Sequence, residues 1–331
     1  MPDPLKIFQR TRNKLNVLKR DLRWQLGMNR VDIGRARGSR ILVYHGICQR
    51  DPLRFNTIFL TQKVFETQLR FYKKYFHIVS LDDFYQQRFS REKFNLCLSF
   101  DDGFFNNYKY VLPLLETYKI PACFFVTGVR ELGHEILWND ALSIAGRYGP
   151  PEFNFMREVF VKNRHGKYVS SRSGKTLNDI LRSTDFSPKA AMIEAFGSLR
   201  ELAEKDFWLQ MSAEEIRSLS KSKWVTIGSH SRYHNDLAET EPHRLKEDLV
   251  DSKTFLQNVT GKEIKALAFP YGSYSRETVR VAKEAGHTQL LATDLLFPED
   301  DRDESLRARL TVNPFISSFK QLHATVKGNY D

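Results

Sequence analysis

The chain has 331 residues, of which 41% are hydrophobic and 13% aromatic, so it can bury a sizeable core in one large domain or two smaller ones. Its three cysteines show no Cys-x-x-Cys spacing, which argues against a disulfide framework or a zinc–thiolate site. No window approaches the roughly 18 apolar residues of a membrane span, and the first residues lack the long uncharged core of a secretory signal. These features predict a cytoplasmic protein.

The net charge of +11 is unevenly distributed. Residues 1–40 hold 11 Lys or Arg and three Asp, and therefore supply +8 of the total. Apolar residues recur at helical spacing among the basic ones over residues 5–28. We predict a basic amphipathic arm and linker over residues 1–39, in which residues 1–38 contact an anionic membrane. The alternative is that the apolar stripe packs on the rest of the protein or on a second subunit. Nucleic acid is not an expected partner, because no binding fold accompanies the arm.

Short apolar runs and helical patterns alternate after the arm. We predict strands at residues 41–46, 77–80, 96–100 and 122–127, separated by helices at 61–76, 81–89 and 108–118. This alternation is typical of parallel strands joined by crossover helices.

The pattern loosens over residues 130–211, where we expect an insertion of helices with a small hairpin around residues 163–167. Such an insertion commonly forms a wall or lid near the active site of a barrel enzyme, although it can also be a packing elaboration without a role in binding. The regular pattern then returns, with helices at 212–220, 242–259 and 277–285 and strands at 224–229, 267–269, 288–293 and 308–312. Eight strands are enough to close a barrel. We therefore predict an α/β protein, an irregular (β/α)7–8 barrel over residues 40–331.

Polar motifs follow three of the predicted strands. These motifs are Asp101-Asp102-Gly103, His230-x-x-x-His234 and Pro270-Tyr271-Gly272. The carboxyl ends of parallel strands in a barrel lie at one rim, so these side chains should meet there. A carboxylate and two imidazoles suit Zn²⁺ or a similar first-row ion. The alternative is that Asp101-Asp102-Gly103 is an ordinary solvated turn and that the two histidines are satisfied polar residues in a turn.

The two adjacent aspartates are expected to have different roles. Consecutive residues that leave a strand point in different directions, so Asp101 and Asp102 cannot easily perform one task together. One should bind the metal and the other should accept the proton of the attacking water.

The ordered set Ser-Phe-Asp-Asp-Gly, His-Ser-Arg-Tyr-His and Phe-Pro-Tyr-Gly resembles the polysaccharide deacetylase family, the NodB-like carbohydrate esterases. The resemblance runs from about Arg40 to Asn313, interrupted by the insertion. It implies that Asp101 is the general base and that the backbone N–H of Tyr271 stabilises the oxyanion. It also implies that Ser231 forms a hydrogen bond within its motif and that the metal ligands are Asp102, His230 and His234.

The sequence departs from the common family pattern at two places. Many members carry an arginine that orients the base, and here that position is Ala268. Many also carry a general-acid histidine in a Leu-x-His motif near the C-terminus, which the last predicted strand lacks. The motif Val43-Tyr44-His45 resembles the Tyr-His arrangement that some relatives carry on the N-terminal strand, so we predict His45 as the general acid. The alternative is a histidine held by a backbone hydrogen bond in a turn.

Together with the motifs, the resemblance implies a metal-dependent amide hydrolase that removes an N-acetyl or N-formyl group from an amino sugar. The expected partner is an amino-sugar-containing polysaccharide, a glycolipid or a lipid-linked saccharide at the inner face of the membrane. Two alternatives stay open: a hydrolase of non-sugar C–N bonds on the same fold, and a catalytically idle carbohydrate-binding protein.

Overall fold

The computed structural model describes Leu22 and residues 30–330. The helix that the sequence predicts over residues 5–28 therefore lies, apart from Leu22, outside the described residues. The described chain begins its regular structure with helix α2 (Arg30–Arg35). In this part of the chain no helix is both long and apolar enough to span a bilayer.

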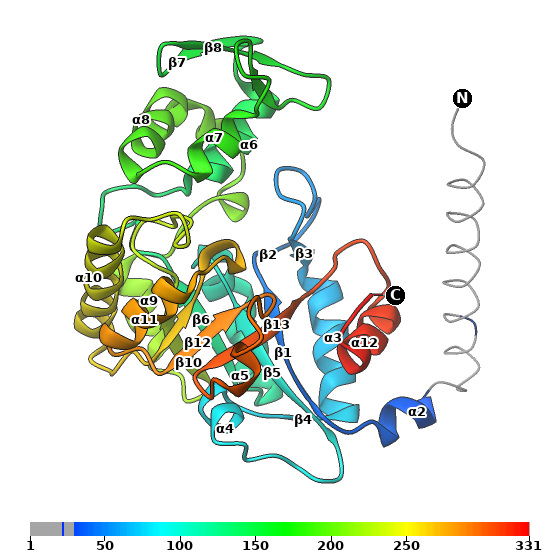
Figure 1. Ribbon diagram of the computed structural model, residues 1–331. Helices are drawn as coiled ribbons and strands as arrows, with labels where there is room; N and C mark the ends of the chain where they lie inside the picture. Colours follow the sequence, from blue (N-terminus) through cyan, green and yellow to red (C-terminus); the bar gives the residue numbers. More distant parts are fainter. Residues whose placement is uncertain (1–21, 23–29, 331) are drawn as a thin grey trace.

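A ring of seven parallel strands forms the centre of the molecule (Figure 1). The strands follow one another around the ring in the order β1 (Ser39–Tyr44), β13 (Leu306–Thr311), β12 (Gln289–Ala292), β11 (Ala266–Ala268), β10 (Val225–Ser229), β6 (Ala122–Val126) and β5 (Phe94–Phe100). The ring closes because β1 pairs with β5 over its whole length, from Ser39 opposite Asn95 to Tyr44 opposite Phe100. The predicted barrel is thus confirmed.

One of the eight predicted strands, at residues 77–80, lies outside the ring. Strand β4 (Phe76–Ile78) pairs with the first three residues of β5, and β6 pairs with the last two. Because β1 occupies one edge of β5 completely, β4 and β6 share the other edge, one after the other. The barrel is therefore closed by seven strands.

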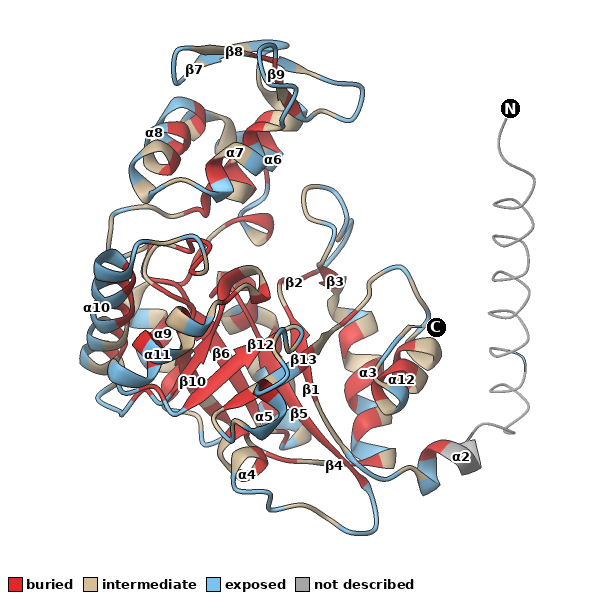
Figure 2. Ribbon diagram, viewed as in Figure 1, coloured by how far each residue is buried: buried red, intermediate tan, exposed pale blue. Residues whose placement is uncertain are grey.

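Strand β5 shows why these segments are strands. All seven of its residues are buried, as expected for a parallel strand that is covered on both faces (Figure 2). Cys97 belongs to the cluster inside the barrel together with Phe125, whereas Leu96 and Leu98 pack outward against the surrounding helices. The interior is tightly filled: a Cβ on Gly228 would lie 2.5 Å from the Phe125 ring.

Helices cover the outside of the ring. They are α3 (Gln62–Tyr75), α4 (Leu81–Tyr85), a π-helical turn (Asn107–Val111) that continues into α5 (Leu112–Tyr118), α9 (Ala213–Ser220), α10 (Pro242–Thr260), α11 (Arg276–Glu284) and α12 (Ser318–Lys327). Two predicted helix starts are confirmed by their caps. The Thr61 hydroxyl accepts a hydrogen bond from the Val64 N–H at 3.3 Å, and Ser212 and Glu215 form a reciprocal capping box. A small parallel pair, β2 (Ile47–Cys48) and β3 (Leu60–Thr61), lies between β1 and α3.

The insertion forms a lobe beyond the barrel (Figure 1). It contains α6 (Trp138–Tyr148), α7 (Leu177–Arg182), α8 (Phe186–Phe196) and an antiparallel sheet of β7 (Glu152–Phe155), β8 (Glu158–Lys162) and β9 (Tyr168–Ser170). The predicted hairpin corresponds to β8 and β9, and the structure adds β7 beside it. Trp138, Phe160 and Phe196 form the core of this lobe, which extends to Phe59 and Phe104 of the barrel loops. The lobe is therefore anchored on the rim.

Candidate active site

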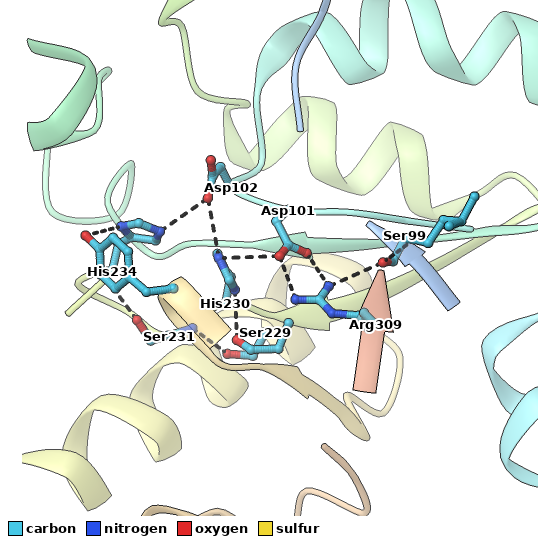
Figure 3. A network of polar contacts seen from close by, with 11 residues as sticks. Ser99, Asp101, Asp102, Ser229, His230, Ser231, His234 and Arg309 are labelled. Atoms are coloured by element: carbon cyan, nitrogen blue, oxygen red, sulfur yellow. Dashed lines mark hydrogen bonds and ion pairs between the residues drawn. The ribbon is translucent and has the colours of Figure 1, made fainter. Parts of the chain in front are cut away.

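The loops after β5 and β10 bring three buried side chains together at the rim. Asp102 Oδ1 lies 3.4 Å from His230 Nε2 and 3.2 Å from His234 Nε2 (Figure 3). The three residues are at most 4% exposed. The structure thus unites residues from two distant motifs, as the sequence analysis predicts.

These three side chains fit a divalent metal ion. Their ligand atoms lie within 4.8 Å of one another, and two atoms bound tetrahedrally to Zn²⁺ at about 2.1 Å are about 3.4 Å apart. His230 Nδ1 lies 2.8 Å from the carbonyl oxygen of Ala268. A carbonyl only accepts, so Nδ1 must donate, and the lone pair of Nε2 then faces Asp102. His234 Nδ1 likewise contacts the Tyr271 hydroxyl at 3.3 Å, which leaves its Nε2 toward Asp102.

The backbone is strained where these side chains converge. Asp102, Ser231, His234 and Tyr271 have φ values of 73°, 63°, 52° and 61°, in the left-handed region that costs a non-glycine residue about 1–3 kcal/mol. Two hydrogen bonds hold the histidine loop in this conformation. The Ser231 hydroxyl accepts from the His234 N–H at 2.9 Å, and Ser229 accepts from the Ser231 N–H at 3.2 Å. The predicted hydrogen bond of Ser231 within its motif is therefore confirmed.

Asp101 makes a different set of contacts from Asp102. Both of its carboxylate oxygens accept hydrogen bonds from the Arg309 guanidinium, each at 2.7 Å, and Arg309 is 4% exposed. Arg309 also donates to the Ser99 hydroxyl at 3.3 Å. Burial alone would raise the pKa of Asp101, but the charges of Arg309 and His230 outweigh burial and lower it below the ordinary value. Asp101 is therefore an oriented carboxylate at neutral pH.

Arg309 is the site residue that the sequence analysis does not identify. Ala268 occupies the position where many family members carry the arginine, and no motif in the sequence points to a substitute. Arg309 reaches Asp101 from β13, 208 residues further along the chain. The sequence did contain one indication of this role. Arg309 lies inside the predicted barrel strand at residues 308–312, where a cation needs a buried partner.

His45 and Tyr271 complete the rim. Both line a cavity of about 220 Å³ together with Asp101, Asp102 and His234. His45 Nδ1 is buried and has no hydrogen-bond partner within the described chain. Burial lowers the pKa of His45, although Asp102 and Asp101 oppose this change. The cavity thus holds a histidine, a carboxylate and the candidate metal ligands.

The insertion supports the histidine loop directly. Arg182 Nε donates to Asp236 Oδ2 at 2.8 Å, and its guanidinium lies 4.5 Å from the centre of the Tyr271 ring. The fully buried Lys189 donates to Asn235 Oδ1 at 2.6 Å, and burial lowers the pKa of Lys189 to about 8. Asn139 of α6 lines the catalytic cavity. The insertion is therefore a wall of the site, one of the two predicted possibilities.

Comparison with known proteins identifies the family. The family model for polysaccharide deacetylases matches residues 90–157 and 177–290, more than half of the chain. The chain belongs to the polysaccharide deacetylase family. YxkH of Bacillus subtilis (strain 168), provisionally named a polysaccharide deacetylase, is 22% identical over 107 residues, which cover 32% of this chain and 38% of that protein. The match thus spans less than half of this relative.

Solved structures share the fold at low sequence identity. The deacetylase PplD of Streptococcus pyogenes, solved in complex with acetate, has a TM-score of 0.57 at 17% identity and covers 87% of this chain and 97% of its own. IcaB of Ammonifex degensii has a TM-score of 0.54 at 17% identity, with coverages of 88% and 98%. These similarities support the irregular barrel with seven strands in its ring.

Proposed function

We propose that this chain is a metal-dependent amide hydrolase that removes an N-acetyl or N-formyl group from an amino sugar. The substrate is a polysaccharide, a glycolipid or a lipid-linked saccharide. One observation carries the proposal: the buried cluster of Asp102, His230 and His234 lies beside a separately held carboxylate, Asp101, in a member of a deacetylase family. PplD, which shares the fold, is a deacetylase solved with acetate, and this favours an acetyl group.

Asp102, His230 and His234 would hold the ion, and their oxygen and nitrogen atoms suit Zn²⁺. When bound, such an ion polarises the amide carbonyl and lowers the pKa of water. Asp101 accepts the proton of the attacking water. Its two oxygens already bind Arg309, but each keeps a further lone pair for this proton. Arg309 keeps Asp101 deprotonated and oriented.

Two further groups, the Tyr271 N–H and the His45 side chain, act on the oxyanion and on the leaving amine. As the water oxygen bonds to the carbonyl carbon, the Tyr271 N–H donates a hydrogen bond to the developing oxyanion. His45 then gives a proton to the amine nitrogen as the C–N bond breaks. In this role His45 would be the general-acid histidine of the Tyr-His motif on the N-terminal strand. The products are the carboxylic acid and the free amino sugar.

The test combines elemental analysis with measurement of acetate and formate release from N-acyl amino sugars. Wild-type protein should contain about one divalent ion per chain and release acid. His230→Ala should lose the ion and the activity together. Asp101→Asn should keep the ion while turnover falls about 10²–10⁴-fold, the usual contribution of a general base.

Three outcomes would contradict this function. Full turnover by Asp101→Asn would remove Asp101 as the base. Sugar binding without turnover by the metal-loaded wild type would indicate an idle binding protein. Acid release from other amides alone would point to a non-sugar C–N hydrolase.

The charge of the basic arm suggests that the enzyme binds its substrate at a membrane. Residues 1–40 supply +8 of the net charge, and each Lys or Arg near an anionic surface contributes about 1 kcal/mol of attraction. We propose that residues 1–38 hold the enzyme at the cytoplasmic face of the membrane. In flotation with vesicles that contain phosphatidylglycerol, the full chain should rise with the lipid and a chain lacking residues 1–38 should not. An unchanged distribution would contradict the proposal.

A further inference from the structure

A second, larger cavity adjoins the catalytic one. It has a volume of about 610 Å³ and lies between the loop of residues 54–58 and the insertion, where α6 and the β8–β9 hairpin form its walls. We call it the distal cavity. Ile58 and Asn139 line both cavities. A saccharide whose N-acyl group enters the catalytic cavity can therefore extend into the distal one.

The distal cavity carries uncompensated positive charge. Arg54, Arg147 and Lys167 line it, all three are exposed, and none forms an ion pair with a carboxylate among the described residues. Arg54 donates to the Tyr148 hydroxyl at 3.1 Å. A cation without a carboxylate partner is available to an anionic ligand.

Asp140 is the only acidic residue that lines the distal cavity within the described chain, and it does not neutralise these cations. The residue is 2% exposed. Burial and, after it, the nearby charge of Asp102 raise the pKa of Asp140 well above its ordinary value. Asp140 Oδ1 accepts a hydrogen bond from Asn56 at 3.3 Å, whereas Oδ2 has no partner. The unpartnered Oδ2 is available to a sugar hydroxyl, and the raised pKa weakens the opposition of this carboxyl group to an anion.

The cationic wall is held in place by packing. The Arg54 and Arg147 guanidinium carbons lie 5.6 Å and 5.9 Å from the centre of the Phe55 ring, which orders both side chains through cation–π contact. On the opposite wall the tip of the hairpin rests on α6. A Cβ on Gly166, which has a φ of +74°, would lie 2.8 Å from the carbonyl oxygen of Gly146. This close contact fixes the hairpin that presents Lys167.

We propose that the distal cavity binds an anionic group of the substrate, a phosphate or a uronic acid carboxylate joined to the amino sugar that is deacylated. This inference rests on the proposed function and narrows its substrate class to acidic saccharides. Guanidinium groups bind phosphate and carboxylate through paired, charge-assisted hydrogen bonds. Because Ile58 and Asn139 line both cavities, an anion bound in the distal cavity would lie next to the sugar in the catalytic cavity.

The kinetic test compares three disaccharides: neutral N,N′-diacetylchitobiose, the same compound with a phosphate at its reducing end, and glucuronyl-N-acetylglucosamine. The wild type should show a KM at least about tenfold lower for one acidic disaccharide than for the neutral one, the size of one charge-assisted hydrogen bond. The preferred disaccharide tells phosphate from uronate. The double variant Arg54→Gln, Arg147→Gln should lose this preference, and added salt should weaken it.

Arg172→Gln is the matched control, because Arg172 is an exposed arginine of the insertion that does not line the distal cavity. It should leave every KM unchanged. Equal KM values for neutral and acidic disaccharides in the wild type would overturn the proposal. A preference that survives in the double variant would also overturn it.

A binding measurement separates this proposal from the hydrolase proposal. Calorimetry with metal-loaded Asp101→Asn protein should show tighter binding of the acidic disaccharide, and the two glutamine substitutions should abolish the difference. Acidic preference in binding without any turnover by the wild type would contradict the hydrolase and support the distal cavity. Turnover without a binding preference would support the hydrolase and overturn the distal cavity.

Discussion

The barrel rim and the insertion serve the site in different ways. The rim supplies Asp101, Asp102 and His230 from strand ends, and their side chains are almost fully buried and contact one another. The insertion supplies long cationic side chains, such as Arg182 and Arg147, which are partly or largely exposed. Buried neighbours define the rim tightly enough to hold strained backbone, whereas the exposed cations of the insertion lie where a ligand can reach them. We infer that the barrel determines the reaction and the insertion determines which saccharide enters.

Two ion pairs illustrate how the rim and the insertion differ in burial. The pair of Asp101 and Arg309 is buried, with side-chain exposures of 5% and 1%, and breaking such a pair typically costs about 3–5 kcal/mol. The pair of Arg182 and Asp236 has exposures of 43% and 5%, and pairs of this more solvated kind contribute about 1 kcal/mol or less. Changes at the rim should therefore have larger effects than changes in the insertion.

The largest effect in this series is expected at His45, on the rim. His45→Gln removes the proposed proton donor to the amine, so turnover of an N-acetyl amino sugar should fall about 10³-fold. Hydrolysis of p-nitrophenyl acetate should fall much less, because nitrophenolate leaves without a proton. The ratio of the two rates is the measurement. His243→Gln, at an exposed position in the first turn of α10, is the control and should leave both rates unchanged. Equal losses on both substrates would contradict the role of His45.

The rim was largely predictable because each motif follows a strand in the sequence. Asp101 and Asp102 follow an apolar run, and His230 and His234 repeat this pattern at a second strand end. Parallel strands then bring the motifs to one rim, whatever the connecting chain does. Arg309 was not predictable in this way. Its role depends on β13 lying next to β1, the neighbour of β5, which only closure of the barrel produces.

The insertion was predictable in position but not in its contacts. Its loosened pattern marked residues 130–211, and Asn163–Lys167 was recognisable as a turn. Nothing in the local sequence indicated that Lys189 would be buried against Asn235, or that Arg182 would reach Tyr271. Long side chains make such contacts across the lobe, so no short spacing encodes them. Charged residues on a helix are usually solvated, whereas Lys189 is fully buried.

The next largest effect is expected at Arg309. Arg309→Met leaves Asp101 buried without its cation, so turnover should fall about 10²-fold and the free energy of unfolding should fall by about 3 kcal/mol or more. Arg309 lowers the pKa of Asp101, so its removal raises that pKa. Because the base must be deprotonated, the acidic limb of the kcat/KM profile should move to higher pH.

Two companion variants make the Arg309 experiment decisive. Arg309→Lys restores the charge without the paired geometry and should move the acidic limb back toward wild type while only part of the turnover returns. Arg307→Lys, on the same strand but outside the catalytic cavity, should leave the profile unchanged. An acidic limb that stays in place in Arg309→Met would show that Arg309 does not tune the base.

The smallest effect is expected at Arg182, the contact between the insertion and the histidine loop. Arg182→Gln removes the partner of Asp236 and the cation above Tyr271, which together contribute about 1–2 kcal/mol. Tyr271 contacts His234 Nδ1, so loosening this stack should weaken metal affinity and kcat/KM together, each about five- to tenfold. Arg182→Lys should recover part of both, and Arg172→Gln should change neither. If Arg182→Gln lowers only the unfolding free energy, with metal affinity and kcat/KM as in the wild type, then the insertion packs beside the loop without positioning it. In that case no tested contact of the insertion would affect the reaction, and the insertion would act only on which saccharide binds.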